Sequence, residues 1–98
     1  MTAPPSDPLA EVCIEFAAGL EGRLQTLRDA LQRLEGAFVA EDAERLHRAA
    51  HSLTGTAGSF GASRLAQVAR ELEQLGAGWV QRREAPPDEW RRATAVVT

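Results

Sequence analysis

Lysine is absent from this sequence, and its eleven basic residues are all arginine. Fourteen aspartate and glutamate residues outnumber them, so the formal net charge at pH 7 is −3. The chain therefore lacks the basic excess with which nucleic-acid-binding proteins neutralise phosphates. The pairs Arg82-Arg83 and Arg91-Arg92 are too short for such a footprint, and we interpret them as solvated surface. We expect no nucleic acid among the partners of this protein.

Long apolar runs are also missing, although 44% of the residues are hydrophobic. No segment is long enough to span a bilayer, and the proline-rich start lacks the basic-then-apolar order of a signal peptide. The single cysteine, Cys13, cannot form an internal disulfide, which fits a reducing compartment. Since it lies between Val12 and Ile14, we predict that it is a buried structural thiol. We expect a cytoplasmic protein that does not contact a membrane.

No segment alternates between apolar and polar residues over a useful length, so there is no case for a β-sheet. Apolar residues instead recur every three or four positions, as they do on one face of a helix. The 98 residues have room for one domain with a modest core. We predict an all-α fold, a single domain over residues 1–98, and an antiparallel up-and-down four-helix bundle with a short N-terminal helix and a short final helix.

The expected order of elements follows from glycine, proline and acidic residues. Gly19 and Gly22 interrupt a leucine stripe, so we predict a bend there, and we interpret Gly36 and the run Gly76-Ala77-Gly78 as helix ends. The predicted segments are a loose leader at 1–7, the first and second helices within 8–35, a histidine-bearing helix at 41–60, a helix at 62–76, a charged connector at 79–85 and a short last helix at 88–97.

The histidine-bearing helix has two different faces. At about 100° per residue, Leu46, Ala50, Leu53 and Ala57 lie on one side, and His51, Gly55 and Gly58 lie on the other. Each glycine inside a helix costs about 1 kcal/mol relative to alanine. Close packing of a neighbouring helix would explain such glycines, but both point away from the apolar side. We interpret them as keeping the surface low, so that a partner reaches the His51 imidazole.

Other chemistry is poorly supported. His47 and His51 have the i, i+4 spacing of a helical metal site, but no glutamate lies between them in the metalloprotease pattern, there is no third histidine, and Cys13 is far off in the sequence. We therefore expect no metal. There is no glycine-rich nucleotide loop and no nucleophile set. We interpret Glu71 and Glu73 as surface charges of a helix, more than as a catalytic pair. The sequence does not predict an enzyme.

One family matches these residues. The run Ala50-His51-Ser52-Leu53-Thr54-Gly55, followed by Gly58, Phe60-Gly61, Leu65 and Leu72-Glu73, resembles the histidine-containing phosphotransfer (HPt) domain of bacterial phosphorelays. The resemblance covers about Leu9 to Leu75 and implies an antiparallel four-helix bundle. It implies that His51 accepts a phosphoryl group from a receiver-domain phosphoaspartate and passes it to another receiver. It also implies a phosphocarrier that binds no ATP and has no kinase activity of its own.

The resemblance further implies which partners and residues are involved. Receiver domains of response regulators, or of a hybrid histidine kinase, would dock on a face that includes His47, Arg48, Thr54, Gly55 and Gly58. The receiver would supply the magnesium ion, and this chain would carry no cofactor. The family usually has lysine three residues after the histidine, where this chain has Thr54. A protonated His47 or Arg48 is a candidate to compensate for the missing charge.

Two alternative functions remain open at this point. The chain is either a non-transferring interaction module, as a degenerate HPt domain would be, or a self-associating structural bundle. The last helix is short, so the fourth side of the bundle is either partly open or filled by another chain. We expect a monomer in preference to a homodimer. Met1 lies close to the first helix, which suggests a free-standing domain.

Overall fold

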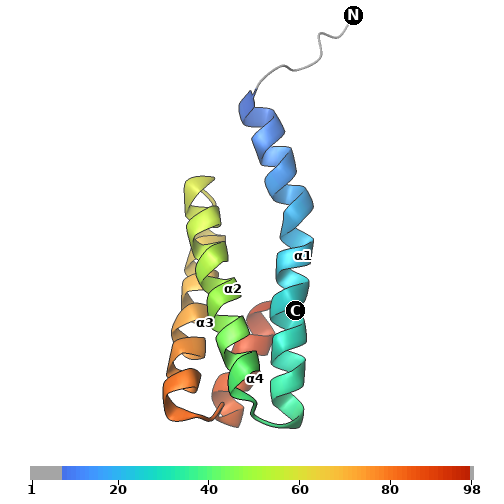
Figure 1. Ribbon diagram of the computed structural model, residues 1–98. Helices are drawn as coiled ribbons and strands as arrows, with labels where there is room; N and C mark the ends of the chain where they lie inside the picture. The colour runs from blue at the N-terminus through green and yellow to red at the C-terminus, as the bar shows by residue number, and fades with distance from the viewer. Residues whose placement is uncertain (1–7, 98) are drawn as a thin grey trace, which may run out of the picture.

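Four helices make up the part of the chain that the computed structural model describes, which is residues 8–97, with side chains from Ile14 onward. They are α1 (Pro8–Gly36), α2 (Ala40–Ser59), α3 (Ser63–Arg82) and α4 (Pro87–Val97), and residues 8–97 contain no strand. α2 and α3 lie side by side and antiparallel, α1 extends well past them, and α4 lies beside the lower part of α1 (Figure 1). The predicted all-helical four-helix bundle is confirmed. The leader at 1–7 and the Cys13 side chain lie outside what is described.

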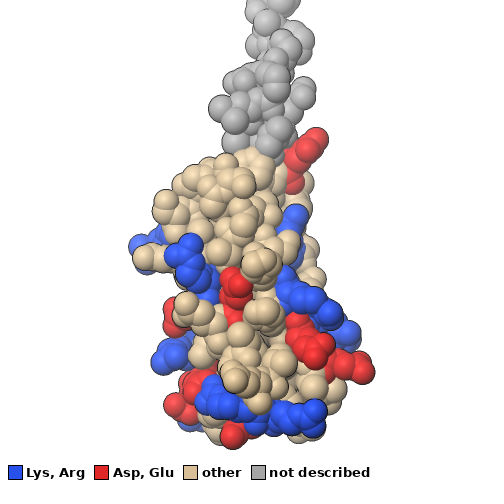
Figure 2. Space-filling view, turned by 60° about the vertical axis from the view of Figure 1, so that its left-hand side comes forward, with Lys and Arg blue, Asp and Glu red and all other residues tan. Residues whose placement is uncertain are grey.

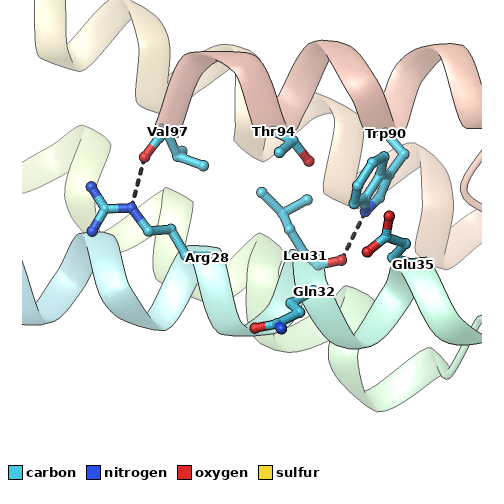
Figure 3. Close-up of a pocket in the computed structure, with 7 residues that line it drawn as sticks. All are labelled: Arg28, Leu31, Gln32, Glu35, Trp90, Thr94 and Val97. Atoms are coloured by element: carbon cyan, nitrogen blue, oxygen red, sulfur yellow. Dashed lines mark hydrogen bonds between the residues drawn. The ribbon is translucent and has the colours of Figure 1, made fainter.

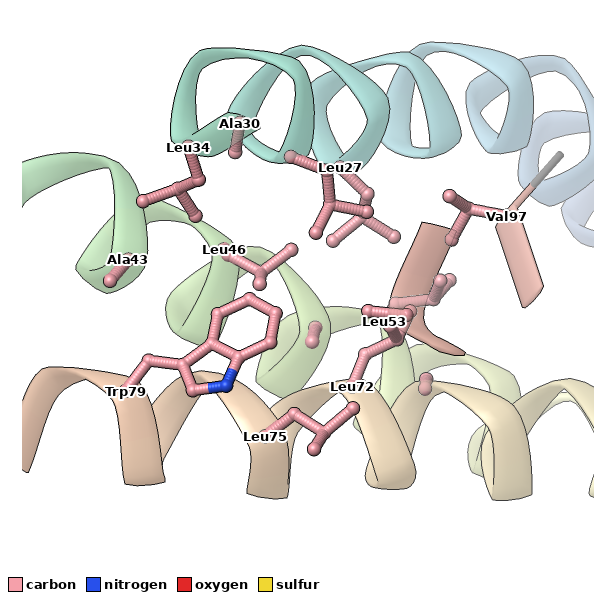
Figure 4. Close-up of a cluster of buried hydrophobic side chains, with 14 residues drawn as sticks. Leu27, Ala30, Leu34, Ala43, Leu46, Leu53, Leu72, Leu75, Trp79 and Val97 are labelled. Carbon is pink, nitrogen blue, oxygen red and sulfur yellow. The ribbon is translucent and has the colours of Figure 1, made fainter. Parts of the chain in front are cut away.

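The core lies between the facing stripes of the helices (Figure 4). Each helix contributes apolar residues three or four positions apart, as a helix with one buried face requires. Its largest fully buried side chains are Trp79, Leu27, Leu31, Leu46, Leu53 and Leu72. Alanines fill the remaining positions, and Ala43, Ala50, Ala57 and Ala69 are completely buried. These small residues let α2 and α3 pack closely along most of their length.

The predicted bend in the first segment is wrong, because α1 is one continuous helix of 29 residues. Gly19 and Gly22 are exposed, and no atom lies within 4 Å of a Cβ built on either. They therefore weaken the helix only by their own propensity and disturb no packing. The stripe that includes Leu20, Leu24 and Leu27 continues along the opposite side and packs against or within the core. Residues 8–36 therefore contain no separate short N-terminal helix.

The predicted end of the next helix at residue 76 is also wrong. α3 continues through Gly76 and Gly78 to Arg82, so the expected connector at 79–85 is mostly helix. Gly76 is buried, and a Cβ at this position would lie 3.1 Å from the His47 Cα. Glycine favours the close approach of the α2 and α3 backbones at this point, because any larger residue would crowd His47. Glycine is also a common helix-ending residue, so the sequence alone predicts a helix end here.

A polar network closes the turn between α3 and α4. Arg83 ends α3 in the left-handed conformation with φ 60°, and its N–H donates to the Trp79 carbonyl at 2.8 Å. The buried Trp79 indole donates to Glu89 Oε1 at 3.0 Å, and Arg82 Nη2 donates to the same oxygen at 2.8 Å. These bonds lower the pKa of Glu89, with the bond from Arg82 as the main cause and that from Trp79 second. Glu89 therefore anchors α4 to the end of α3.

α4 is short, as predicted, and it covers only the C-terminal half of α1. The Trp90 indole donates to the Leu31 carbonyl at 2.7 Å, and Arg28 Nε donates to the Val97 carbonyl at 2.8 Å (Figure 3). Toward its N-terminus, α1 extends past the end of α4 (Figure 1). In this part of α1, the Phe16 ring stacks on the Phe60 ring, and the two ring centroids are 4.6 Å apart.

Candidate functional site

The two faces of α2 lie as the helical phase predicts. Leu46 and Ala50 are fully buried and Leu53 is 1% exposed, whereas the His51 side chain is 73% exposed. Successive residues of a helix are rotated by about 100°, so the burial of Leu46, Ala50 and Leu53 directs the His51 side chain toward solvent. The position of His51 is therefore a direct consequence of core packing. Its imidazole is on the surface of the bundle, on the side of α2 that adjoins α3.

His51 has one charged partner, and it comes from α3. His51 Nδ1 lies 2.6 Å from Glu73 Oε2, and the Glu73 side chain is only 22% exposed. A carboxylate has no proton to donate, so the hydrogen in this bond belongs to Nδ1. In the neutral imidazole the other nitrogen, Nε2, then carries a free lone pair. The bond fixes both the tautomer and the orientation of the ring.

The surface next to His51 is low. Gly55 and Gly58 are exposed, and a Cβ built on either would have no atom within 4 Å. They therefore serve no packing inside the described chain, in contrast to Gly76. Their cost of about 1 kcal/mol each in helix propensity has no compensation within the bundle itself. An approaching molecule therefore finds open space at the Cβ positions one and two turns after His51.

His47 and Thr54 are less accessible than expected of a partner face. His47 is half-buried against Gly76, and its ring centroid is 6.5 Å from that of His51. Thr54 is also half-buried, and its hydroxyl donates to the Ala50 carbonyl at 2.9 Å. Threonine hydroxyls commonly bond back to the preceding turn in this way. The Thr54 hydroxyl is thus already used by its own helix.

Arg48 is exposed one turn before His51, and it forms no ion pair among residues 14–97. After His51 the chain carries no charged residue between Ser52 and Ser63. On the face that Figure 2 shows, the upper part of the described surface is mostly uncharged, and most of the basic and acidic side chains lie below it.

Sequence reasoning missed two contacts of this site. The sequence predicts that Glu73 is a surface charge, whereas it is the hydrogen-bond partner of His51. Nothing in the sequence points to Arg23 of α1, whose Nη1 donates to Ser52 Oγ at 3.2 Å beside the histidine. The leucine–glutamate pair at 72 and 73 was a usable signal for the first contact. No signal in the sequence identified the second, because it depends on how α1 is rotated against α2.

The described residues offer little support for other sites. Residues 14–97 contain no group of three or more histidine, cysteine, aspartate or glutamate side chains that could hold a metal ion. Among the described helices, none combines the length and the apolar character that crossing a bilayer requires. The surface around His51 is thus the one place where an exposed nucleophile, an orienting carboxylate and an open approach coincide in the described part of the chain.

One of three comparisons with known proteins found a match, and it concerns the family of the chain. The family model described as "Hpt domain" matches residues 11–97, which is most of the chain. Searches of curated proteins and of solved structures returned no match. The matched range includes His51, Glu73, Gly55 and Gly58, together with the whole of α4.

Proposed function

This chain belongs to the Hpt domain family, and on that premise we propose that His51 is its phosphoacceptor. Hpt domains are phosphocarriers of phosphorelays and are not kinases, and they generally interact with receiver domains. In the proposed function His51 accepts a phosphoryl group from a receiver phosphoaspartate and passes it to a second receiver. The observation that carries the proposal is the exposed His51 ring with Nδ1 bonded to Glu73.

The geometry supports attack by Nε2. With its proton held on Nδ1, the ring presents an unprotonated nitrogen to the solvent side, and neutral imidazole is a good nucleophile. Glu73 stabilises the positive charge that develops on the ring as the nitrogen attacks. This is the role that a carboxylate plays for the catalytic histidine of serine proteases. Glu73 is a positioning residue, since it acts through His51.

The transfer step balances without a further reactant. The Nε2 lone pair attacks phosphorus, the N–P bond forms, and the P–O bond to the receiver aspartate breaks, which returns a free carboxylate to the receiver. Phosphoryl transfer depends mainly on in-line placement and on stabilisation of charge at the phosphoryl oxygens. The open space at Gly55 and Gly58 supports such placement, because it lets the receiver approach the His51 ring closely. The receiver would hold the magnesium ion.

The proposal includes a monomer in the cytoplasm that meets its receivers transiently. A small contact around one histidine suits a carrier that must release each partner after transfer. Light scattering on the purified protein tests the oligomeric state directly. A mass of twice the 10.6 kDa chain would favour a self-associating bundle in place of a monomeric carrier.

A transfer assay tests the function. The purified protein is incubated with phosphorylated receiver domains, and the chain is then analysed for phosphate that is labile in acid and stable in base. We expect such phosphate on the wild type and none on His51→Gln, which keeps a polar side chain of similar size on an exposed position. His47→Gln is the matched control, because the second histidine of α2 should be dispensable for labelling.

Each outcome is informative. Labelling that persists in His51→Gln would refute His51 as the acceptor. If the wild type binds receivers but is never labelled by several of them, the chain is a non-transferring module. Labelling lost in both histidine variants would show that His47 also contributes, and the pair would have to be reconsidered as a unit.

A further inference from the structure

Two hollows lie along the seam between α2 and α3, one on each side of the bond between His51 and Glu73. The first is lined by Glu44, His47 and Arg48 of α2 and by Ala77 and Val80 of α3. The second is lined by Gly58 of α2 and by Gln67 and Arg70 of α3. Each hollow thus contains one arginine, and the two arginines come from different helices.

The positions of the two arginines are related by the antiparallel packing. Arg48 lies three residues before His51, and Arg70 lies three residues before Glu73. Residues three apart on a helix are neighbours on its surface, with Cβ atoms roughly 5–6 Å apart. Since α2 and α3 run in opposite directions, the two arginines lie at opposite ends of the His51–Glu73 bond. They flank it from below and from above.

Both guanidinium groups are available. Five other arginines form ion pairs, and Arg23 is bonded to Ser52. Arg48 and Arg70 are exposed and form neither an ion pair nor a side-chain hydrogen bond among residues 14–97. Glu44 lies one turn before Arg48 and Glu73 one turn after Arg70, but neither carboxylate forms an ion pair with its neighbouring arginine. Each guanidinium group is therefore free to turn toward a new anion.

A phosphoryl group on His51 would require such charge. It would add about two negative charges beside the carboxylate of Glu73, since phosphoryl groups on side chains carry roughly −1.5 to −2 at pH 7. Thr54 supplies no charge, and its hydroxyl is bonded to the Ala50 carbonyl. Arginine suits the task, because its planar fork of N–H donors matches phosphoryl oxygens.

We propose that Arg48 and Arg70 form a clamp that binds the phosphoryl oxygens on His51 from both sides. This inference rests on the proposed function, because it needs the phosphorylated histidine. The clamp does not take part in bond making. It stabilises the phosphorylated form of this chain against hydrolysis and against return of the group to the receiver. Two arginines from two helices do here what a single lysine at position 54 would do.

The test compares the lifetime of the phosphorylated protein in Arg48→Gln, Arg70→Gln and the double variant. We expect each single substitution to shorten the lifetime several-fold and the double to shorten it by about tenfold or more, as the loss of charge-assisted hydrogen bonds implies. Arg→Lys at either position should restore part of the lifetime. Arg91→Gln is the matched control, because Arg91 is an exposed arginine of α4 that forms no ion pair among the described residues.

A second variant separates the clamp from effects on folding. Thr54→Lys in the double variant should return the lifetime toward that of the wild type, whereas the same substitution alone should change it little. Phosphorus NMR adds an independent readout, because loss of the two cations should raise the pH at which the phosphoryl resonance titrates. A lifetime and a titration unchanged in the double variant would overturn the clamp, even though labelling of His51 itself remains. Absence of any labelling would instead refute the proposed function.

Discussion

Glu73 decides which nitrogen of His51 faces a partner. It holds the hydrogen on Nδ1, so its removal frees the ring to adopt either tautomer and to rotate. We predict that Glu73→Ala lowers the initial rate of phosphoryl transfer to this chain by about tenfold or more, in line with the effect of removing an orienting partner. The rate is measured with excess phosphorylated receiver, and helix content by circular dichroism is the control.

Glu73→Gln refines the same prediction. The glutamine carbonyl still accepts a hydrogen bond from Nδ1, so the tautomer is kept while the negative charge is lost. We expect an intermediate rate. If glutamine is as slow as alanine, charge stabilisation of the ring matters more than its orientation, and equal rates in all three proteins would contradict a role for Glu73.

At this scale the sequence predicts the residues of one helix well and the contacts between helices poorly. The exposure of His51, Gly55 and Gly58 follows from the phase of α2 alone. The contact with Glu73 depends on how far α2 and α3 are shifted along one another. That shift is set by Gly76 meeting His47, and a single sequence does not reveal it.

Alanine variants of Gly76 in α3 and Gly22 in α1 compare the contribution of a closely packed glycine to stability with that of an exposed one. Gly76→Ala would place a Cβ 3.1 Å from the His47 Cα, a backbone atom that cannot move aside cheaply. We predict a loss of about 1–3 kcal/mol in the free energy of unfolding, as for other overpacked sites. Urea unfolding measures it.

Gly22→Ala is the matched control for that experiment. Its Cβ would meet no atom within 4 Å, so only helix propensity changes, and we predict a gain of up to about 1 kcal/mol. A loss of stability in Gly22→Ala would indicate that α1 needs a flexible joint there. An unchanged Gly76→Ala would show that the two helices separate at little cost.

Glu89 links α3 to α4 in a way that depends on pH. The hydrogen bonds from Arg82 and Trp79 hold its pKa below the usual 4.5. A carboxyl group with a depressed pKa in the folded state stabilises the fold above its unfolded pKa, and this contribution is lost as the pH falls through the folded value. We predict that wild type is more stable than Glu89→Gln near neutral pH and that the difference shrinks as the pH falls below about 4.5. Thermal unfolding of both proteins across this range measures the difference, and a difference independent of pH would contradict it.

The errors in predicting elements have one physical cause. Glycine pairs predict breaks in a helix, but in α1 and α3 the packing of neighbouring residues keeps the helix continuous through them. Local propensity is a weak term compared with the burial of a leucine stripe or of Trp79. The short α4 was predictable because Pro86 and Pro87 set its start and no tertiary contact overrides them.

The molecule as a whole has a firmly packed end and a less supported one. α4, both tryptophans and the Glu89 network lie at the end where α1 meets α2 through its loop. At the other end α1 is packed on one side only, Ile14 is 65% exposed, and Phe16 on Phe60 is the stacking contact. His51 lies between these two ends on the opposite side of α2. Local opening at the less supported end would therefore leave the region around His51 intact.

Hydrogen exchange tests this gradient of stability. Backbone amides protected only by local structure exchange through small openings, whereas those in the packed core exchange through global unfolding. We predict that amides from Ile14 to Gly22 exchange more than about tenfold faster than those from Leu27 to Leu34, although both segments belong to one helix. Amides around His51 should follow the slower group, because Ala50 and Leu53 anchor that part of α2 in the core. Phe60→Ala should accelerate only the first group, since it removes the stack on Phe16. If amides along the whole of α1 exchange equally slowly, the segment from Ile14 to Gly22 is stabilised by something other than α4. Self-association through that segment would be the first explanation to test.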